Sequence, residues 1–151
     1  MRPMQVRKIA AAVVALLAGT TFALAATRDD AVAMVKKAVA AIKADGTEKA
    51  YAEINRGGQF VDGEIHVGVS SPDSVTVAHA TNPKLIGKNM TDVQDVDEKF
   101  FSKDMTERAR KESSFWYDYK FVNRVTQKIQ VKDNYCARLG STRVCAGVYR
   151  P

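Results

Sequence analysis

The chain has 151 residues, of which 23 are basic and 17 acidic, and its formal net charge is +6. This length is typical of one domain, and it allows a hydrophobic core without metal staples. The basic residues are interspersed with acidic ones, as in 107–112, and no stripe of Lys and Arg with interleaved aromatic residues indicates a nucleic-acid-binding protein.

The N-terminal segment has the order of a secretory signal. Basic residues within 1–8 precede an apolar run over 9–18, and Ala23 and Ala25 offer the small side chains of a cleavage site. The apolar run is ten residues long, about half of what a membrane span needs. The segment is therefore interpreted as a signal peptide rather than as a membrane anchor.

We expect residues 1–25 to be removed by cleavage after Ala25. Residues 26–151 then remain as one soluble domain in the periplasm or outside the cell. Three basic residues leave with the signal, so 20 basic residues face 17 acidic ones and the net charge falls to +3.

Two helices are predicted at the start of this domain. Thr27 can cap the first helix, in which apolar residues recur at helical spacing. They are Val32, Val35, Val39 and Ile42. Asp45-Gly46 ends this helix, and a second helix is expected from Thr47 to Asn55, before Gly57-Gly58.

The pattern then changes to the two-residue alternation of strands. Apolar side chains alternate with polar or small ones at Ile65, Val67 and Val69. After a turn at 71–74, a second strand is expected from Val75 to His79, with His79 on its apolar side. By this parity His66 and His79 lie on opposite kinds of face, which argues against a shared metal site.

A loop at 82–89, a helix near 97–112 and three strands complete the pattern. The strands are expected at Ser114–Val122, Lys128–Tyr135 and Thr142–Tyr149. Short connections between them imply antiparallel neighbours. The sequence therefore predicts an α+β fold with one mostly antiparallel sheet.

Cys136 and Cys145 are the only cysteines, and an even number in an exported chain indicates a disulfide. A two-residue hairpin turn at Gly140-Ser141 places them directly opposite each other at a non-hydrogen-bonded position, with Cα atoms about 4.5 Å apart. A structural bridge is favoured over a redox-active pair, because the Cys-x-x-Cys spacing is missing. The same register sets Arg138 against Arg143, a repulsive pair.

Motifs of catalysis are missing from the sequence. It contains no Gly-x-Ser-x-Gly elbow and no glycine-rich phosphate loop, and a bridge would remove both cysteines as nucleophiles. The acidic stretch 92–98 lacks the glycine and the final glutamate of a calcium loop. We expect no catalytic residue, no metal and no cofactor, and hence no enzyme.

The segment Phe115–Phe121 concentrates the single Trp with two Tyr residues and a Lys. Its aromatic rings either fill the core around a central strand or line a pocket, where hydroxyl and ammonium groups would fix a polar or anionic ligand. Strand parity points Tyr117 and Tyr119 to one face, and Trp116 and Lys120 to the other. These four side chains therefore do not share one cavity in a regular strand.

A series of individually weak motifs covers almost all of the predicted domain in one order. They are Lys49–Asn55, Phe60-x-Asp-Gly63, Ala78–Asn89, Trp116–Lys120, Lys132–Tyr135 and Gly147–Tyr149. By these motifs the chain resembles the single Cache domain, type 2-like, a sensing module of bacterial chemotaxis receptors and sensor kinases. The resemblance implies a long N-terminal helix on one face of a five-stranded antiparallel sheet, and on the other face a pocket that binds a short carboxylate or an amino acid without turnover.

The resemblance also implies the residues of this pocket, which are His79, Trp116, Tyr119, Lys132 and Tyr135. Lys132 would be the counter-charge of a carboxylate, although a regular strand points Lys132 and Tyr135 to opposite faces. Receptors of the family continue into a transmembrane helix, so a separate membrane receptor, sensor kinase or transporter is the partner implied. The alternatives are a structural or interaction protein with a closed vestigial pocket and, more distantly, a small hydrolase.

Overall fold

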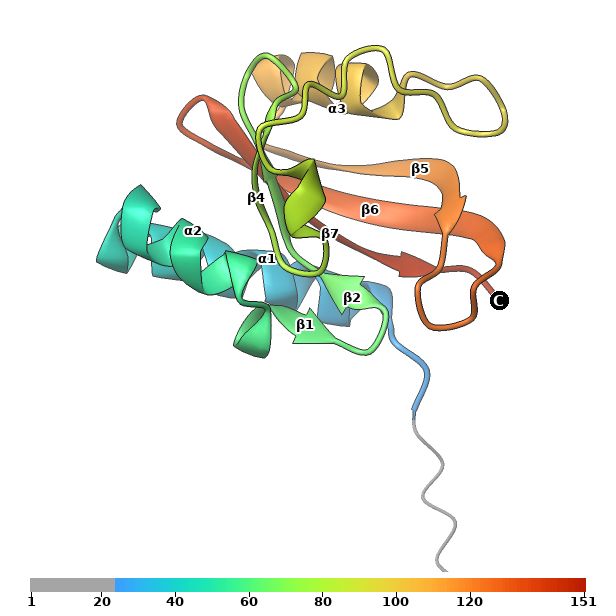
Figure 1. Cartoon of the computed structure of the whole chain (residues 1–151), viewed down its shortest axis with the longest axis horizontal. Coiled ribbons are helices and arrows are strands. Elements are labelled where there is room, and N and C mark those ends of the chain that lie inside the picture. The colour runs from blue at the N-terminus through green and yellow to red at the C-terminus, as the bar shows by residue number, and fades with distance from the viewer. Residues whose placement is uncertain (1–23) are drawn as a thin grey trace, which may run out of the picture.

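The computed structural model describes residues 24–151, so the predicted signal peptide lies outside the described residues except for its last two. The described chain forms a five-stranded sheet in the order β4-β3-β7-β6-β5, in which all neighbours are antiparallel. Helices cover both faces of this sheet (Figure 1). The predicted α+β fold is confirmed.

The long helices and strands occur in the order that the sequence predicts, but several begin or end at other residues. The helices are α1 (Arg28–Asp45), α2 (Thr47–Asn55) and α3 (Phe101–Lys111), with short 3-10 turns η1 (Gly58–Phe60) and η2 (Pro83–Leu85). The strands are β1 (Val61–Asp62), β2 (Ile65–His66), β3 (Gly68–Ser70), β4 (Thr76–His79), β5 (Ser114–Val122), β6 (Ile129–Leu139) and β7 (Thr142–Tyr149).

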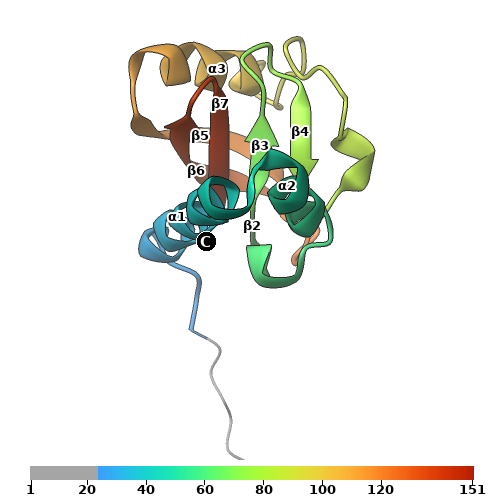
Figure 2. The same cartoon turned by 90° about the vertical axis from the view of Figure 1, so that its left-hand side faces the viewer.

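The helix α1 packs on one face of the sheet and carries the larger core. It begins with a capping box, in which the Thr27 hydroxyl accepts a hydrogen bond from the Asp30 amide and the Asp30 carboxylate accepts one from the Thr27 amide. Its buried stripe contacts the inward row of the strands. That row includes Val67, Val69, Val144, Ala146 and Val148. Figures 1 and 2 show α1 and α2 on this face and α3 on the opposite one.

The helix α3 begins at Phe101, four positions later than the predicted start near Asp97. Before it, the Asp95 carboxylate accepts hydrogen bonds from the amides of Asp97 and Lys99, and Glu98 has a φ of 62°. An aspartate that binds its own following backbone favours a turn over a helix. The acidic residues before Phe101 therefore form a loop.

The strands also differ from the prediction in their extent. The expected strand at Ile65–Val69 is divided at Val67, because β2 pairs with the unpredicted β1 while β3 pairs with β4 and β7. The strand β6 runs past Tyr135 to Leu139, as the hairpin predicted around Gly140-Ser141 requires. Among the described residues, no helix is long and apolar enough to cross a membrane.

The hairpin of β6 and β7 carries the predicted disulfide. Cys136 and Cys145 are directly opposite each other and their sulfurs are bonded, which confirms the expected bridge. Gly140 at the turn has a φ of 60°, a conformation that glycine adopts without strain. The predicted register of the hairpin is therefore correct, including the apposition of Arg138 and Arg143.

Candidate functional site

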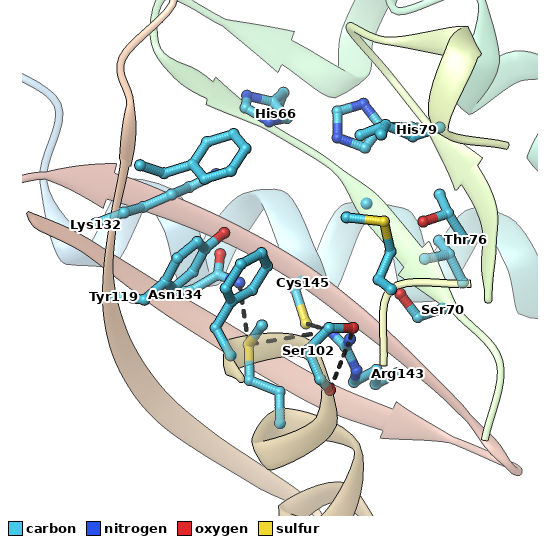
Figure 3. A pocket seen from close by; sticks show the side chains of 17 residues that line it. His66, Ser70, Thr76, His79, Ser102, Tyr119, Lys132, Asn134, Arg143 and Cys145 are labelled. Carbon is cyan, nitrogen blue, oxygen red and sulfur yellow. Dashed lines mark hydrogen bonds between the residues drawn. The ribbon is translucent and has the colours of Figure 1, made fainter. Parts of the chain in front are cut away.

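A cavity of about 100 Å³ lies on the α3 side of the sheet (Figure 3). For comparison, one water molecule occupies about 30 Å³ in the liquid, so the cavity suits a small guest. Its floor comes from the sheet, and its cover comes from α3 and from the chain between β4 and α3. The polar side chains around it are those of His66, Ser70, Thr76, His79, Ser102, Tyr119, Lys132, Asn134 and Arg143.

Lys132 enters the cavity from β6 and is 5% exposed. Within residues 24–151, its ammonium group takes part in no ion pair and donates no hydrogen bond to another residue. Its Nζ lies 5.5 Å from the centre of the Tyr149 ring. Burial lowers the pKa of Lys132 to about 8, against the opposing effect of the Glu64 carboxylate. The side chain is buried, but no fully buried side-chain nitrogen of the described residues lacks a hydrogen-bond partner, so the Lys132 ammonium keeps access to the cavity, where a bound anion would be attracted to it.

Arg143, on β7, supplies a second buried positive charge to the wall of the cavity, and it is also 5% exposed. Its guanidinium donates to the hydroxyl of Ser102 at 2.7 Å and to the hydroxyl of Thr106 at 3.3 Å. Burial lowers the pKa of Arg143 to about 10, which leaves it charged at neutral pH. Across the described part of the chain, no carboxylate forms an ion pair with it.

The two histidines meet at the cavity, with ring centres 5.1 Å apart. The Nδ1 atom of His79 accepts hydrogen bonds from the amides of Thr81 and Asn82, so the proton of the neutral ring is on Nε2. His66 Nδ1 lies 3.1 Å from the Glu64 carbonyl oxygen, to which it donates. Burial, together with the charge of Lys132, lowers the pKa of His66 to about 2 and that of His79 to about 4. Both rings are therefore neutral near pH 7.

The prediction that His66 and His79 occupy opposite kinds of face is wrong. Ala78 faces Val69 in the ladder, but the next residue of β3, Ser70, faces Thr76, which leaves Val77 as an extra residue. A bulge of this kind changes the alternation along β4, and His79 turns to the cavity instead of the apolar core. The described residues nevertheless hold no cluster of three or more metal-binding side chains.

Three of the five predicted pocket residues surround this cavity, namely His79, Tyr119 and Lys132. Tyr119 and Lys132 are direct partners on β5 and β6. Trp116 and Tyr135 are directly opposed on the same strands but point to the α1 face, with ring centres 5.2 Å apart. The five residues are thus not brought together, because strand alternation separates them.

Arg143 was not among the predicted pocket residues. Its sequence signal was the apposition to Arg138 in the hairpin register, since two like charges placed opposite each other need a counter-charge. Ser102 and Asn134 were also missed. Their contribution depends on how α3 and β6 pack around the cavity, which no local pattern reveals.

Aromatic side chains close one side of the cavity. The rings of Phe101 and Tyr119 are stacked, with centres 4.4 Å apart, and the edge of Phe121 meets both rings. Burial raises the pKa of Tyr119, so its hydroxyl stays protonated. Aromatic rings and the cations of Lys132 and Arg143 thus line the same cavity, and this combination suits a small anion with an apolar part.

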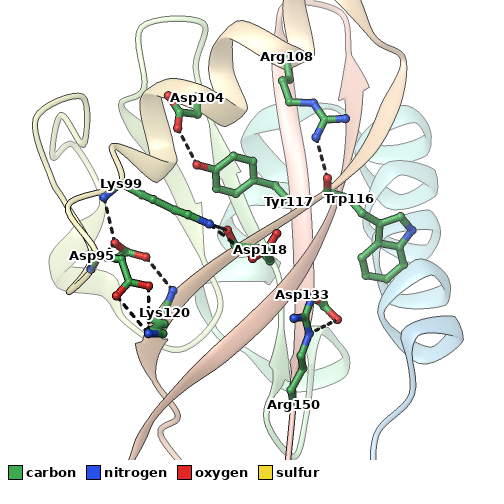
Figure 4. A network of polar contacts seen from close by, with 11 residues as sticks. Asp95, Lys99, Asp104, Arg108, Trp116, Tyr117, Asp118, Lys120, Asp133 and Arg150 are labelled. Atoms are coloured by element: carbon green, nitrogen blue, oxygen red, sulfur yellow. Dashed lines mark hydrogen bonds and ion pairs between the residues drawn. The ribbon is translucent and has the colours of Figure 1, made fainter.

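The cover of the cavity is fastened to β5 by polar contacts (Figure 4). The Asp95 carboxylate accepts a hydrogen bond from the Lys120 amide, and Lys99 donates to the carbonyl of Asp118. From α3, Asp104 accepts a hydrogen bond from the Tyr117 hydroxyl at 2.6 Å. The exposed ion pairs of Lys99 with Asp118 and of Lys120 with Asp97 contribute little individually, so the buried apolar residues of α3 hold most of the cover in place.

Comparison with known proteins identifies a family that the chain matches. The model of the family described as Single Cache domain 2 matches residues 5–141. No curated protein gives a significant match.

Three solved structures share the fold of the chain. A methyl-accepting chemotaxis protein from Vibrio parahaemolyticus RIMD 2210633 has a TM-score of 0.70 at 17% identity, covering 80% of this chain and 86% of its own. A Cache chemosensory domain that recognises carboxylic acid has a TM-score of 0.70 at 18% identity, covering 82% and 92%. The periplasmic sensor domain of a chemotaxis protein has a TM-score of 0.64 at 22% identity, covering 82% and 90%.

Proposed function

Because the chain belongs to the single Cache domain 2 family, a family of sensing modules, we propose that it binds a small carboxylate and senses it without catalysis. The observation that carries this proposal is the ammonium group of Lys132, a residue that is 5% exposed, which lines the cavity without an ion-pair partner in the described chain. Arg143 adds a second positive charge to the lining of the same cavity. Both histidines are neutral near pH 7, so the cavity has an excess of positive charge.

A simple carboxylate fits the cavity better than an amino acid. Among the described residues that line it there is no Asp or Glu, and an α-ammonium group would lie near Lys132 without a counter-charge. The aromatic rings of Phe101 and Phe121 would contact the hydrocarbon part of the ligand. The similarly folded chemosensory domain recognises carboxylic acid, which agrees with this choice.

The cellular setting is also part of the proposal. The signal-like order of residues 1–25 and the periplasmic placement of one similarly folded sensor domain support export to the periplasm. In this setting a separate membrane receptor, sensor kinase or transporter would read the ligand-bound state. A structural protein with a closed pocket has less support, because the described residues leave a cavity of about 100 Å³ lined by Lys132, which forms no ion pair with any of them.

The proposed function is tested by calorimetric titration of the purified protein with short monocarboxylates, and with the corresponding alcohols as uncharged controls. The carboxylates should bind saturably and the alcohols should not. Lys132→Met should weaken binding by about 30-fold or more, as expected for the loss of a buried charge pair. Lys128→Met removes an exposed lysine just before β6 and should leave the affinity unchanged. Equal affinity of Lys132→Met and the unmodified protein would refute the proposal.

A further inference from the structure

Three arginines, Arg110, Arg138 and Arg143, gather where the hairpin of β6 and β7 meets α3. From this group we infer a second anion-binding site, separate from the carboxylate cavity, that takes a small soluble oxyanion with more than one negative charge. Inorganic phosphate is the simplest such ion. This inference does not depend on the proposed function.

The site is a hollow of about 220 Å³ in which three elements meet. Arg110 comes from α3, Arg138 from β6 and Arg143 from β7. The hydroxyl groups of Ser71 and Thr106 also line the hollow. A guanidinium group binds oxyanions through paired N–H donors, so three of them with added hydroxyls form a suitable donor set.

Within residues 24–151, none of the three arginines forms an ion pair. Arg110 uses Nη2 to donate to the Pro72 carbonyl at 2.9 Å, and Arg138 uses Nη1 to donate to the carbonyls of Ala109 and Arg110. These contacts with neutral acceptors hold the side chains in place without neutralising them. Arg110 and Arg138 each have further guanidinium nitrogens without a hydrogen-bond partner in the described chain.

The arrangement of these charges is unfavourable unless an anion is present. Arg138 and Arg143 are directly opposed on β6 and β7, and like charges in that position repel each other. Arg110 adds a third charge from α3. Asp73 and Glu107 line an adjacent hollow with Arg110, but neither comes within ion-pair distance of it in the described chain. A bound oxyanion would remove this repulsion.

Arg143 lines both this hollow and the carboxylate cavity, so the two sites should influence each other. Two anions on either side of one guanidinium repel each other and share its positive charge. Phosphate should therefore weaken carboxylate binding, and the carboxylate should weaken phosphate binding by the same factor. This coupling, unlike the site itself, rests on the proposed function.

The site is tested by calorimetric titration of the full protein with inorganic phosphate in a chloride buffer of constant ionic strength. Arg138→Gln and Arg110→Gln change exposed side chains outside the carboxylate cavity, and each should lower phosphate affinity about tenfold, the effect of losing one charge-assisted hydrogen bond. The matched control is Lys111→Gln, an exposed residue of α3 outside the hollow, which should bind phosphate like the unmodified protein. Melting temperatures verify that each variant is folded.

Lys132→Met distinguishes this site from the carboxylate cavity. Its phosphate affinity should stay unchanged while its carboxylate binding falls. Loss of phosphate binding in Lys132→Met would mean that phosphate occupies the carboxylate cavity, which overturns the inference. Equal losses in Lys111→Gln and Arg138→Gln would indicate diffuse charge attraction, and an absence of saturable phosphate binding would also refute the site. None of these results bears on carboxylate binding, which is measured separately.

Discussion

Lys132 is buried against β5 and β7 with its ammonium group turned to the cavity, and burial lowers its pKa to about 8. The same desolvation that makes the charged form unfavourable in the empty protein strengthens its attraction to a bound carboxylate. At neutral pH the group is mostly protonated and therefore ready to bind an anion. Ligand affinity and the protonation of Lys132 should be linked.

The first prediction concerns the pH dependence of carboxylate binding. Above pH 8 the ammonium of Lys132 loses its proton in the empty protein, so affinity should decrease by up to about tenfold per pH unit. Calorimetry between neutral and alkaline pH measures this decrease. In Lys132→Arg the charge persists, and any remaining binding should be nearly constant over the same range. A constant affinity in the unmodified protein would show that Lys132 is not the counter-charge.

The second prediction concerns stability in acid. The folded protein keeps His66 and His79 neutral down to pKa values of about 2 and about 4, whereas the unfolded chain binds protons near pH 6.5. The unfolded state thus binds more protons, and the free energy of unfolding should fall as the pH decreases from about 6.5 to about 4.

Urea unfolding at several pH values measures this slope. In His79→Asn the side-chain oxygen can replace Nδ1 as the acceptor for the amides of Thr81 and Asn82. This variant should lose less stability between pH 6.5 and pH 4 than the unmodified protein does. Identical slopes would contradict the depressed pKa of His79.

The alternation of side chains along a strand predicts much of which residues line the cavity. It separates Tyr119 from Trp116, and Lys132 from Tyr135, as the structure does. Motif matching ignores this alternation, and for that reason it combined residues from both faces. The hairpin register identifies Arg143 only as the repulsive partner of Arg138, and its place in the cavity depends on how α3 packs on the sheet.

At the scale of elements, the sequence predicts each long helix and strand, and the errors are local. The bulge at Val77 and the late start of α3 depend on pairing with distant chain segments and on the hydrogen bonds of Asp95. A propensity pattern contains neither kind of information. The hairpin of β6 and β7 was predictable, because the turn at Gly140-Ser141 determines its register.

The third prediction concerns the disulfide in this hairpin. Replacing both Cys136 and Cys145 by alanine should lower the free energy of unfolding by about 2–3 kcal/mol, the value expected for a bridge that closes a short loop. Urea denaturation provides the measurement. Thiol titration of the unfolded, unreduced protein is the control and should find no free thiol. Free thiols, or a loss well below 1 kcal/mol, would contradict a stabilising bridge.

Over the whole molecule, the sheet separates the apolar core from the cavity. The α1 face contains most of the apolar core, and the α3 face contains the cavity, the buried cations and the disulfide. The alternation of side chains along β6 and β7 divides the residues between these faces.

The fourth prediction concerns export. Expressed in a bacterial host, the protein should accumulate in the periplasmic fraction with a mass that corresponds to a start at Ala26, since residues 1–25 have the order of a secretory signal. Intact-mass spectrometry of the fractions measures this. The control is the double variant Arg7→Glu and Lys8→Glu, which should keep the mass of the full chain because the basic start of the signal is lost. A periplasmic protein that keeps Met1 would contradict cleavage after Ala25.

We propose that the cavity beneath α3 binds a small carboxylate through Lys132. A crystal structure of the protein grown with the tightest-binding carboxylate shows whether it does. We expect a carboxylate oxygen within hydrogen-bond distance of Lys132 Nζ, with the apolar end of the ligand against Phe101 and Phe121. A cavity that holds only water while the ligand occupies another place would contradict it.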